Sequence, residues 1–385
     1  MIYNLISIKN KSKKFTEMVA KIGKAKIGIL LFVILVAISV NSEKKLPKEI
    51  ANLKDSIIKI EKINDKIIVV SKNGRILTLN KEPRIVDELH LNLTIASVCF
   101  PKRDLMVFLS GKEVLSYKNA SLERHMKIPT EILYRDAFDC KGEAIVIGLR
   151  NGSILYIEDL NRNKSFELKT RNNGSYIICT RFHNDGMVAV SDKGVEIYEP
   201  EGKLKKSKRF ENTYVRSCFI ANEKIGIGLG NFSLEVLDLS LKEKIRRNLN
   251  AEIGVVRIKD NFLLAGLRNG KFYVFDLEKN TMVLEKNVGS SVVNMDAWRN
   301  RVFIGTLDQR LLVYTIHGIK EMEFQLEGFP TEIFHDKDSL FIGTNIGTVY
   351  YLTFRKNRPM EILIFGMCFI SVIIALLITI KALIH

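Results

Sequence analysis

The chain has 385 residues, of which 59 are Lys or Arg and 43 are Asp or Glu, so its formal net charge is +16. Hydrophobic residues make up 46% of the chain and charged residues 26%, a balance that excludes a wholly disordered protein. Its five cysteines are too few for a small domain framed by disulfides.

The amino-terminal part of the sequence combines a basic tail with a short apolar segment. Residues 1–26 hold seven lysines against the single acid Glu17, which predicts a cytoplasmic tail. Residues 27–40, IGILLFVILVAISV, are uncharged, but fourteen residues fall short of the ~20 that a bilayer-spanning helix needs. The small residues Ala37 and Ser39 favour a cleaved secretory signal peptide, and the unbroken apolar run is equally typical of an uncleaved signal anchor.

The region 46–355 repeats one pattern eight times. Each copy is an apolar strand, a polar turn and a strand of alternating apolar and polar residues, as in AIVIGLRNGSILYIEDL at 144–160. The turns centre on Gly74, Gly111, Gly152, Gly194, Phe232, Gly270, Gln309 and Gly347. Successive centres are 37 to 42 residues apart, and two further strand-like runs fit into each period. Four strands form one blade, so the sequence predicts an all-β, eight-bladed β-propeller, with seven blades as the alternative.

The turns and the ends of this array allow two finer predictions. Glycine suits a tight turn because it adopts positive φ without strain, so the turns at Phe232 and Gln309 are expected to differ in shape from the other six. The last hairpin ends at Phe354 without an outer strand. Residues 48–53, KEIANL, precede the first inner strand and are predicted to supply that strand, which closes the ring and hides its edges.

Three of the repeats resemble those of a known family. VFIGTLDQRLLVY (302–314), LFIGTNIGTVYYL (340–352) and NGKFYVFDLEKNTMVLEK (269–286) are similar to PQQ-like, quinoprotein-type propeller repeats, in which a strand ending in Gly-Thr leads into an Asp-Gly turn. The family's Thr-Gly-Lys turns are missing, and the lone Trp298 lies on an inner strand. WD-repeat propellers are similar too, although no Gly-His or Trp-Asp dipeptide occurs. The resemblance implies eight blades but no particular function, because propellers host many functions.

The carboxyl-terminal end predicts a transmembrane helix. Residues 362–380, ILIFGMCFISVIIALLITI, are uncharged, and residues 381–385 form a short tail. The amino-terminal lysines place the region between the two apolar segments outside the cytoplasm, whereas Arg355, Lys356 and Arg358 oppose that orientation. Because the first segment usually dominates, we predict an integral membrane protein with its propeller on the extracytoplasmic side, at the cell surface or in the ER lumen.

The positive charge is concentrated near these predicted membrane segments. Residues 1–42 carry a net charge of +6, residues 355–385 carry +3, and the whole region between them carries +7. More than half of the excess positive charge therefore bears on membrane topology. Because the propeller is predicted to be exported, we do not expect it to bind nucleic acid.

Six N-x-S/T sequons are consistent with export. They begin at Asn92, Asn119, Asn151, Asn163, Asn173 and Asn231. Roughly three would arise by chance, and Asn-Gly-Ser is also favourable turn chemistry. These asparagines are the candidate glycosylation sites, with plain turn residues as the alternative.

Four cysteines fall on the inner strands of consecutive predicted blades: Cys99, Cys140, Cys179 and Cys218. Aligned on the following hairpins, the first and third have one strand parity and the other two have the opposite parity, so they point to opposite sheet faces. One interpretation is therefore a pair of inter-blade disulfides, Cys99 with Cys140 and Cys179 with Cys218. The other is four buried thiols that act as small core residues. Cys368 lies within the predicted transmembrane helix.

Two basic clusters follow the third strands of the fourth and fifth predicted blades. They contain Lys203, Lys205, Lys206, Lys208 and Arg209 in the first, and Lys242, Lys244, Arg246 and Arg247 in the second. Their positions predict neighbouring sites near the outer rim. Such a patch suits an acidic partner or anionic lipid headgroups, or else serves as a solvated, lysine-rich edge that limits aggregation.

Signals for catalysis are weak. The six histidines show no metal-ligand spacing, and no P-loop or nucleophile elbow occurs. Asp136, Asp139 and Asp296 lie on inner strands, where they are expected to line the central channel as solvated acids. We therefore expect no enzyme, no catalytic residue, no cofactor and no metal.

Together these observations favour a non-catalytic interaction scaffold in a membrane-associated assembly, with protein partners and contact with membrane lipid. Two alternatives stay open. One is a quinoprotein-like oxidoreductase, which the family resemblance implies. The other is a cytosol-facing, membrane-tethered WD-type propeller that regulates a GTPase, similar to the exchange factor of vesicle budding.

Overall fold

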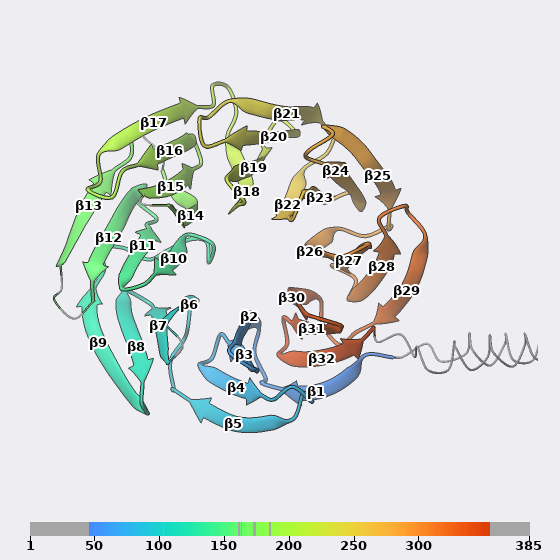
Figure 1. The fold of residues 1–385 in the computed structure, drawn as a ribbon, viewed down its shortest axis with the longest axis horizontal. Helices are drawn as coiled ribbons and strands as arrows, with labels where there is room; N and C mark the ends of the chain where they lie inside the picture. The colour runs from blue at the N-terminus through green and yellow to red at the C-terminus, as the bar shows by residue number, and fades with distance from the viewer. Residues whose placement is uncertain are drawn as a thin grey trace, which may run out of the picture. The chain divides into compact units, whose positions relative to one another are not determined.

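The computed structural model describes residues 46–354 except 103, 161, 163, 172–174 and 185. In this part the chain forms 32 β-strands in eight four-stranded antiparallel sheets. The sheets lie radially around a common centre as the blades of a propeller (Figure 1). The prediction of an all-β, eight-bladed propeller is confirmed, and the seven-bladed alternative is wrong.

Blades 1 to 4 follow one another along the chain, and each runs from an inner to an outer strand (Figure 1). Blade 1 contains β2 (Ile57–Ile63), β3 (Lys66–Ser71), β4 (Arg75–Leu79) and β5 (Ile85–His90). Blade 2 contains β6 (Ser97–Lys102), β7 (Leu105–Ser110), β8 (Glu113–Lys118) and β9 (Ser121–Lys127). Blade 3 contains β10 (Phe138–Lys141), β11 (Ala144–Gly148), β12 (Ser153–Asp159) and β13 (Lys164–Lys169). Blade 4 contains β14 (Ile177–His183), β15 (Gly186–Ser191), β16 (Gly194–Tyr198) and β17 (Leu204–Arg209).

Blades 5 to 7 repeat this order, and blade 8 combines both ends of the array. Blade 5 contains β18 (Val215–Ala221), β19 (Lys224–Leu229), β20 (Ser233–Asp238) and β21 (Glu243–Asn248). Blade 6 contains β22 (Ile253–Lys259), β23 (Phe262–Leu267), β24 (Lys271–Asp276) and β25 (Thr281–Asn287). Blade 7 contains β26 (Val292–Trp298), β27 (Arg301–Thr306), β28 (Arg310–Thr315) and β29 (Lys320–Gln325). Blade 8 contains β30 (Pro330–Asp336), β31 (Ser339–Thr344), β32 (Thr348–Thr353) and β1 (Lys48–Asn52).

Ring closure follows the prediction made from residues 48–53. Strand β1 pairs antiparallel with β32, with Lys48 opposite Tyr351 and Asn52 opposite Thr348. Just beyond β1, the Leu53 amide donates to the Gly347 carbonyl at 2.9 Å. Leu53 is fully buried in a cluster that joins blade 8 to blade 1. The first strand of the array therefore completes the last sheet.

Apolar side chains between neighbouring sheets form the core. The middle strands are buried on both faces, so they read as continuous apolar runs; in β15, residues 187–191 are all buried. One cluster joins Val188 and Val190 of blade 4 to Ile225 and Ile227 of blade 5. Each such side chain contributes about 1.5–3 kcal/mol when it is fully buried. This layered packing makes the ring a rigid support for the charged groups on its surfaces.

The hairpin turns differ from the expectation in one respect. Six of them share one geometry, in which the central residue has φ between 67° and 93° and its amide donates to the carbonyl three residues earlier: Gly74, Gly152, Phe232, Gly270, Gln309 and Gly347. The prediction that the Phe232 and Gln309 turns differ is therefore wrong. Side-chain hydrogen bonds, such as the Ser233 amide to Asn231 Oδ1 at 3.2 Å, help to offset the cost of positive φ there. The turns at Gly111 and Gly194 are the ones that differ, because each leaves only two residues between its strands.

Residues 46–354, with the gaps named above, contain no helix long and apolar enough to cross a membrane. The predicted tail at 1–26, the signal peptide or signal anchor at 27–40, the transmembrane helix at 362–380 and the tail at 381–385 lie outside the described residues. They stay predictions from the sequence.

Candidate functional site

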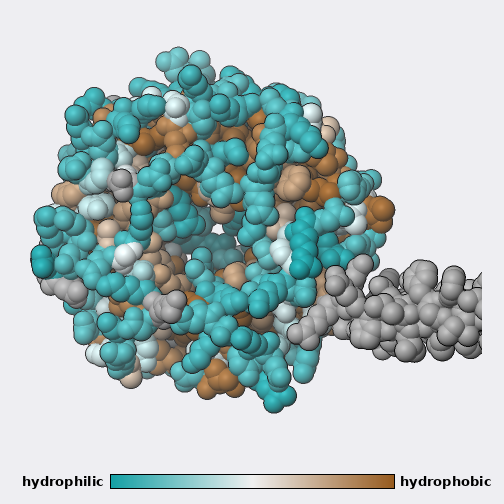
Figure 2. Space-filling model, in the orientation of Figure 1, coloured by the Kyte–Doolittle hydropathy of each residue, from teal (hydrophilic) through white to brown (hydrophobic). Residues whose placement is uncertain are grey.

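A cavity of about 380 Å³ lies at the inner ends of the blades, and the space-filling view is hollowed at the centre of the ring (Figure 2). Its walls come from the first strands β2, β6, β10, β14 and β30 and from the segment before β10. The charged residues of this lining are Lys59, Glu61, Arg135, Asp136, Asp139, Arg181 and Glu332. We call these seven residues and Arg257 the channel cluster.

The segment before β10 brings two members of this cluster into the channel. Strand β10 is the shortest of the inner strands, with four residues where the others have six or seven. The residues just before β10 form a turn instead of extending the strand. In this turn the Ala137 amide donates to the Tyr134 carbonyl at 3.1 Å. Between these two residues lie Arg135 and Asp136, so the turn presents both charges to the cavity.

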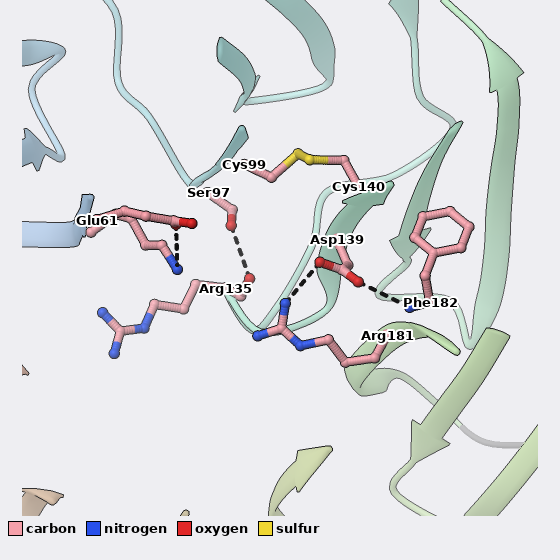
Figure 3. Close-up of a disulfide and its surroundings, with 9 residues drawn as sticks. Glu61, Ser97, Cys99, Arg135, Asp139, Cys140, Arg181 and Phe182 are labelled. Atoms are coloured by element: carbon pink, nitrogen blue, oxygen red, sulfur yellow. Dashed lines mark hydrogen bonds and ion pairs between the residues drawn. A yellow bond between two sulfur atoms is a disulfide. The ribbon is translucent and has the colours of Figure 1, made fainter. Parts of the chain in front are cut away.

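Arg135 spans the channel and joins blade 3 to blades 1 and 8. Its guanidinium lies 2.9 Å from the Glu332 carboxylate on β30. It also donates to the carbonyls of Ile58 on β2 and Thr331 on β30, both at 3.1 Å. The backbone carbonyl of Arg135 also accepts a hydrogen bond, from the Ser97 hydroxyl on β6 at 2.9 Å (Figure 3). One side chain therefore links parts of the ring that are almost two hundred residues apart in sequence.

Two of the three acids expected in the channel are paired with arginines. Asp139 accepts from the Arg181 guanidinium at 2.8 Å and from the Phe182 amide at 2.9 Å (Figure 3). Asp136 lies 3.9 Å from Arg257. Asp296, the third expected channel acid, instead lies 2.9 Å from His335 Nδ1. In the part of the chain that the structure describes, no group of three or more His, Cys, Asp or Glu side chains is arranged to hold a metal ion.

Burial and the surrounding charges together shift the pKa values of two carboxyl groups of the cluster in opposite directions. Burial opposes the ionisation of Asp136, but Arg257, Arg135 and Arg181 outweigh it and hold the pKa of Asp136 below its usual value. At Glu332, burial prevails over the attraction of Arg135 and raises the pKa. The cluster therefore favours a charged Asp136 and disfavours a charged Glu332.

The Asp136 shift predicts an acid-dependent loss of stability. A carboxyl group with a lowered native pKa contributes stability above its unfolded pKa of about 3.9 and loses it as the pH falls through the native value. Asp136→Asn should therefore reduce the drop in the free energy of unfolding between about pH 6 and pH 3. Urea denaturation across this range measures it, with the exposed Asp65→Asn as the control. An unchanged pH dependence in Asp136→Asn would contradict the prediction.

The four cysteines of the inner strands lie in two pairs. Cys99 on β6 is bonded to Cys140 on β10, with their Cα atoms 6.1 Å apart (Figure 3). Cys179 on β14 is bonded to Cys218 on β18, with Cα atoms 6.4 Å apart. These are the partners that strand parity predicts. The first pair ties blade 2 to blade 3, and the second ties blade 4 to blade 5.

Oxidation of these pairs in the protein can be tested directly. We expect non-reducing mass spectrometry of the full-length chain to find Cys99 linked to Cys140 and Cys179 linked to Cys218. Bridges that close loops of about forty residues stabilise by roughly 3–4 kcal/mol each in the chain-entropy model, so reduction should lower the unfolding midpoint. Four thiols alkylated without prior reduction would contradict the prediction and favour the alternative of buried free thiols.

The two basic clusters predicted from sequence lie on neighbouring outer strands, β17 and β21, with Lys203 and Lys242 directly before them. They are joined through Glu235, a buried acid on β20, whose carboxylate lies 3.0 Å from Lys208 and 3.6 Å from Arg246. Lys244 is paired with Asp238 at 3.1 Å. Among the described residues, no acidic side chain forms an ion pair with the other six members: Lys203, Lys205, Lys206, Arg209, Lys242 and Arg247. The structure thus brings the two clusters together and leaves most of their charge available.

The candidate glycosylation sites that the structure describes are all exposed. They are Asn92, Asn119, Asn151 and Asn231, while Asn163 and Asn173 lie outside the described residues. In the Asn151 turn, the side-chain Oδ1 accepts from the Ser153 amide at 3.1 Å. This hydrogen bond involves the side-chain oxygen of Asn151. The side-chain nitrogen, to which a glycan would attach, takes no part in it. Glycosylation stays a prediction at all six positions.

Sequence reasoning did not single out Arg135, Glu332 or Glu235. A usable signal existed for Glu235, because most blades have Leu or Tyr at this position of the third strand, such as Leu77 and Tyr273. Arg135 and Glu332 carried no comparable signal, because their contact appears only when distant blades meet around the channel.

Comparisons with known proteins place the fold but not a family. No protein-family model matches the chain, and no curated protein matches it. The computationally designed protein Ika8 is similar with a TM-score of 0.69 at 13% identity, covering 79% of this chain and 98% of that one. BamB from Moraxella catarrhalis (TM-score 0.64, 11% identity) and Sqt1 from Saccharomyces cerevisiae (0.65, 12%) each align over 80% of this chain and their own full length. These likenesses support the propeller fold alone, so the PQQ-like and WD-like resemblances are not confirmed.

Proposed function

We propose that the protein is a non-catalytic interaction scaffold, anchored in a membrane, whose propeller lies outside the cytoplasm. The observation that carries the scaffold role is the contrast between two charged regions. The channel cluster is neutralised by its own ion pairs, whereas six cations of the rim have no ion-pair partner among the described residues. Charge that is available to a protein partner thus lies on the outside of a rigid ring.

The location rests on the sequence and on the cysteine pairs. The seven lysines before residues 27–40 favour export of the propeller. Disulfides persist in oxidising compartments, and four cysteines lie in two bonding pairs. The exposed sequon asparagines also fit an extracytoplasmic surface.

Protease protection on sealed membranes tests the location. We expect the propeller to resist protease added from the cytoplasmic side and to become sensitive when the membrane is opened. In a eukaryotic host, glycosidase treatment should also shift its mass if the sequons are used. A propeller digested from the cytoplasmic side of intact membranes would contradict this proposal. It would favour the cytosol-facing WD-type alternative, which Arg355, Lys356 and Arg358 support.

The absence of catalysis is also a proposal. Asp136 and Asp139 are held by arginines, an arrangement that suits a structural role better than the binding of a cation. Full-length protein incubated with a quinone cofactor and calcium is expected to show no bound-cofactor spectrum. A stoichiometric spectrum would favour the quinoprotein-like oxidoreductase.

A further inference from the structure

The charge on the outer strands of the ring is unevenly distributed. Strand β17, LKKSKR, carries four cations and no acid, and β21, EKIRRN, carries three cations and one acid. The other six outer strands together carry seven cations and eight acids. The two basic strands belong to neighbouring blades, so with Lys203 and Lys242, which directly precede them, they form one basic arc on an otherwise neutral rim (Figure 1).

The exposed cations of β17 alternate along the strand. Lys205 and Arg209 are exposed and lie four residues apart, with the exposed Ser207 between them. An extended peptide has the same two-residue period, so acidic residues at alternate positions can face these cations together. Because β17 is the outermost strand of its sheet, no fifth strand among the described residues pairs with its outer edge.

A groove adjoins the arc between blades 5 and 6. It has a volume of about 360 Å³, and Arg247, near the end of β21, is one of the residues that line it. Its wall is mixed: Leu249, Tyr273, Phe275 and Met282 supply the apolar part, and polar side chains, including Lys271 and Glu285, supply the rest. Met282 is 52% exposed, whereas Leu249, Tyr273 and Phe275 are buried, so Met282 is the apolar side chain of this wall that is open to solvent. The groove thus offers a site for a large apolar side chain next to the positive charge.

We propose that the basic arc and this groove bind an acidic, extended protein segment that carries a large apolar residue. The proposal deepens the scaffold function above and rests on it. The arc supplies charge complementarity and the groove supplies an apolar anchor, a combination that fits a peptide. A simple polyanion uses the charge but has no side chain for the groove.

Fluorescence anisotropy with the full-length chain in neutral detergent tests the proposal. The probes are a labelled peptide of alternating Glu and Thr with one central Phe, and its twin in which Gly replaces Phe. The arc variant combines Lys205→Gln, Arg209→Gln, Lys242→Gln and Arg247→Gln. The matched control combines Lys48→Gln, Lys127→Gln, Lys169→Gln and Lys286→Gln, which removes the same charge from exposed positions on four other outer strands.

The arc variant is expected to bind the Phe peptide at least about tenfold more weakly, while the control variant binds it like the wild type. Binding should also weaken at high salt. Met282→Ser should weaken binding of the Phe peptide but not of its Gly twin, because only the Phe uses the groove. Circular dichroism checks that all variants are folded.

Three results would overturn the proposal. They are no binding of the Phe peptide, equal weakening in the arc and control variants, or tight arc-dependent binding to vesicles containing phosphatidylserine without binding to the peptide. The last result would assign the arc to the membrane surface. If the Phe peptide does not bind, the result of the protease-protection experiment is unaffected. This proposal can therefore fail while the proposed location stands. A cytosolic propeller that still binds the Phe peptide through the arc would reject only the proposed location.

Discussion

Gly347→Ala is expected to lower the free energy of unfolding by about 3 kcal/mol or more, among the largest effects of any single substitution in the ring. Gly347 has φ +93°, a conformation that side chains with a Cβ rarely adopt. A Cβ at this position would lie 2.6 Å from the amide nitrogens of both Lys54 and Asp55. The Gly347 carbonyl also accepts a hydrogen bond from the Leu53 amide, so the strain would act on the junction that closes the ring.

Gly111→Ala is the control for this prediction, since it also places a Cβ at positive φ, although in a shorter turn. Gly111 occupies the corresponding hairpin of blade 2 and has φ +56°, but no atom lies within 4 Å of the position of its Cβ. We expect a loss of about 1 kcal/mol, due to the backbone conformation alone. Guanidinium denaturation of both variants measures the difference. Equal losses would show that contact with residues 54 and 55 contributes nothing to closure.

The second large effect is expected for Arg135→Met. This change leaves Glu332 without its cation and removes the donor to two backbone carbonyls, at Ile58 and Thr331. Removing one partner of a buried pair costs about 3–5 kcal/mol, and the partial exposure of both side chains reduces this to an expected loss of about 2 kcal/mol. The double variant with Glu332→Gln should recover part of the loss, because no uncompensated carboxylate remains.

The pH dependence of Arg135→Met gives this prediction a second measurement. Burial already raises the pKa of Glu332, and loss of Arg135 should raise it further. A group with a raised native pKa contributes its stability below the unfolded pKa of about 4.3 and loses it as the pH rises through the native value. The destabilisation by Arg135→Met should therefore grow between about pH 4 and pH 7. Arg162→Met, which breaks an exposed pair with Asp159, is the control and should change stability by about 0.5 kcal/mol or less. A loss in Arg135→Met as small as in Arg162→Met would contradict the prediction.

Much of the architecture is readable from the sequence, because propeller blades repeat their local chemistry. The period of the hairpins is sufficient to count eight blades, and KEIANL could be assigned to blade 8 because its last hairpin lacks an outer strand. Strand parity is a local property too, so the positions of Cys99 and Cys140 along their strands indicate this pair as one of two interpretations, with free buried thiols as the other. The turn at Phe232 could not be predicted, because residue preference for positive φ is overridden there by hydrogen bonds within the turn.

The channel cluster could not be predicted for a different reason. Arg135 reaches Thr331 across almost two hundred residues of sequence, and their contact depends on the curvature of the closed ring rather than on any local pattern. The basic clusters were predicted to be neighbours because they occupy equivalent places in consecutive blades. Glu235 stands out in the sequence as an acid where most blades have Leu or Tyr, but its ion pair with Lys208, which joins the two clusters, depends on how blades 4 and 5 pack together.

The pairing of β1 with β32 has a consequence for biosynthesis. A nascent chain completes β1 near residue 52 but cannot give it a partner until residue 348 has left the ribosome. Seven blades can form in order as they emerge, because each consists of consecutive strands. Throughout that time β1 has no partner strand and the face of blade 1 that packs against blade 8 stays uncovered, so the growing chain presents an open edge for other chains or chaperones to bind. Premature termination before β32 should therefore yield an open array and not a smaller ring. The pairing of β32 with β1 is thus the step that commits the propeller to its native form.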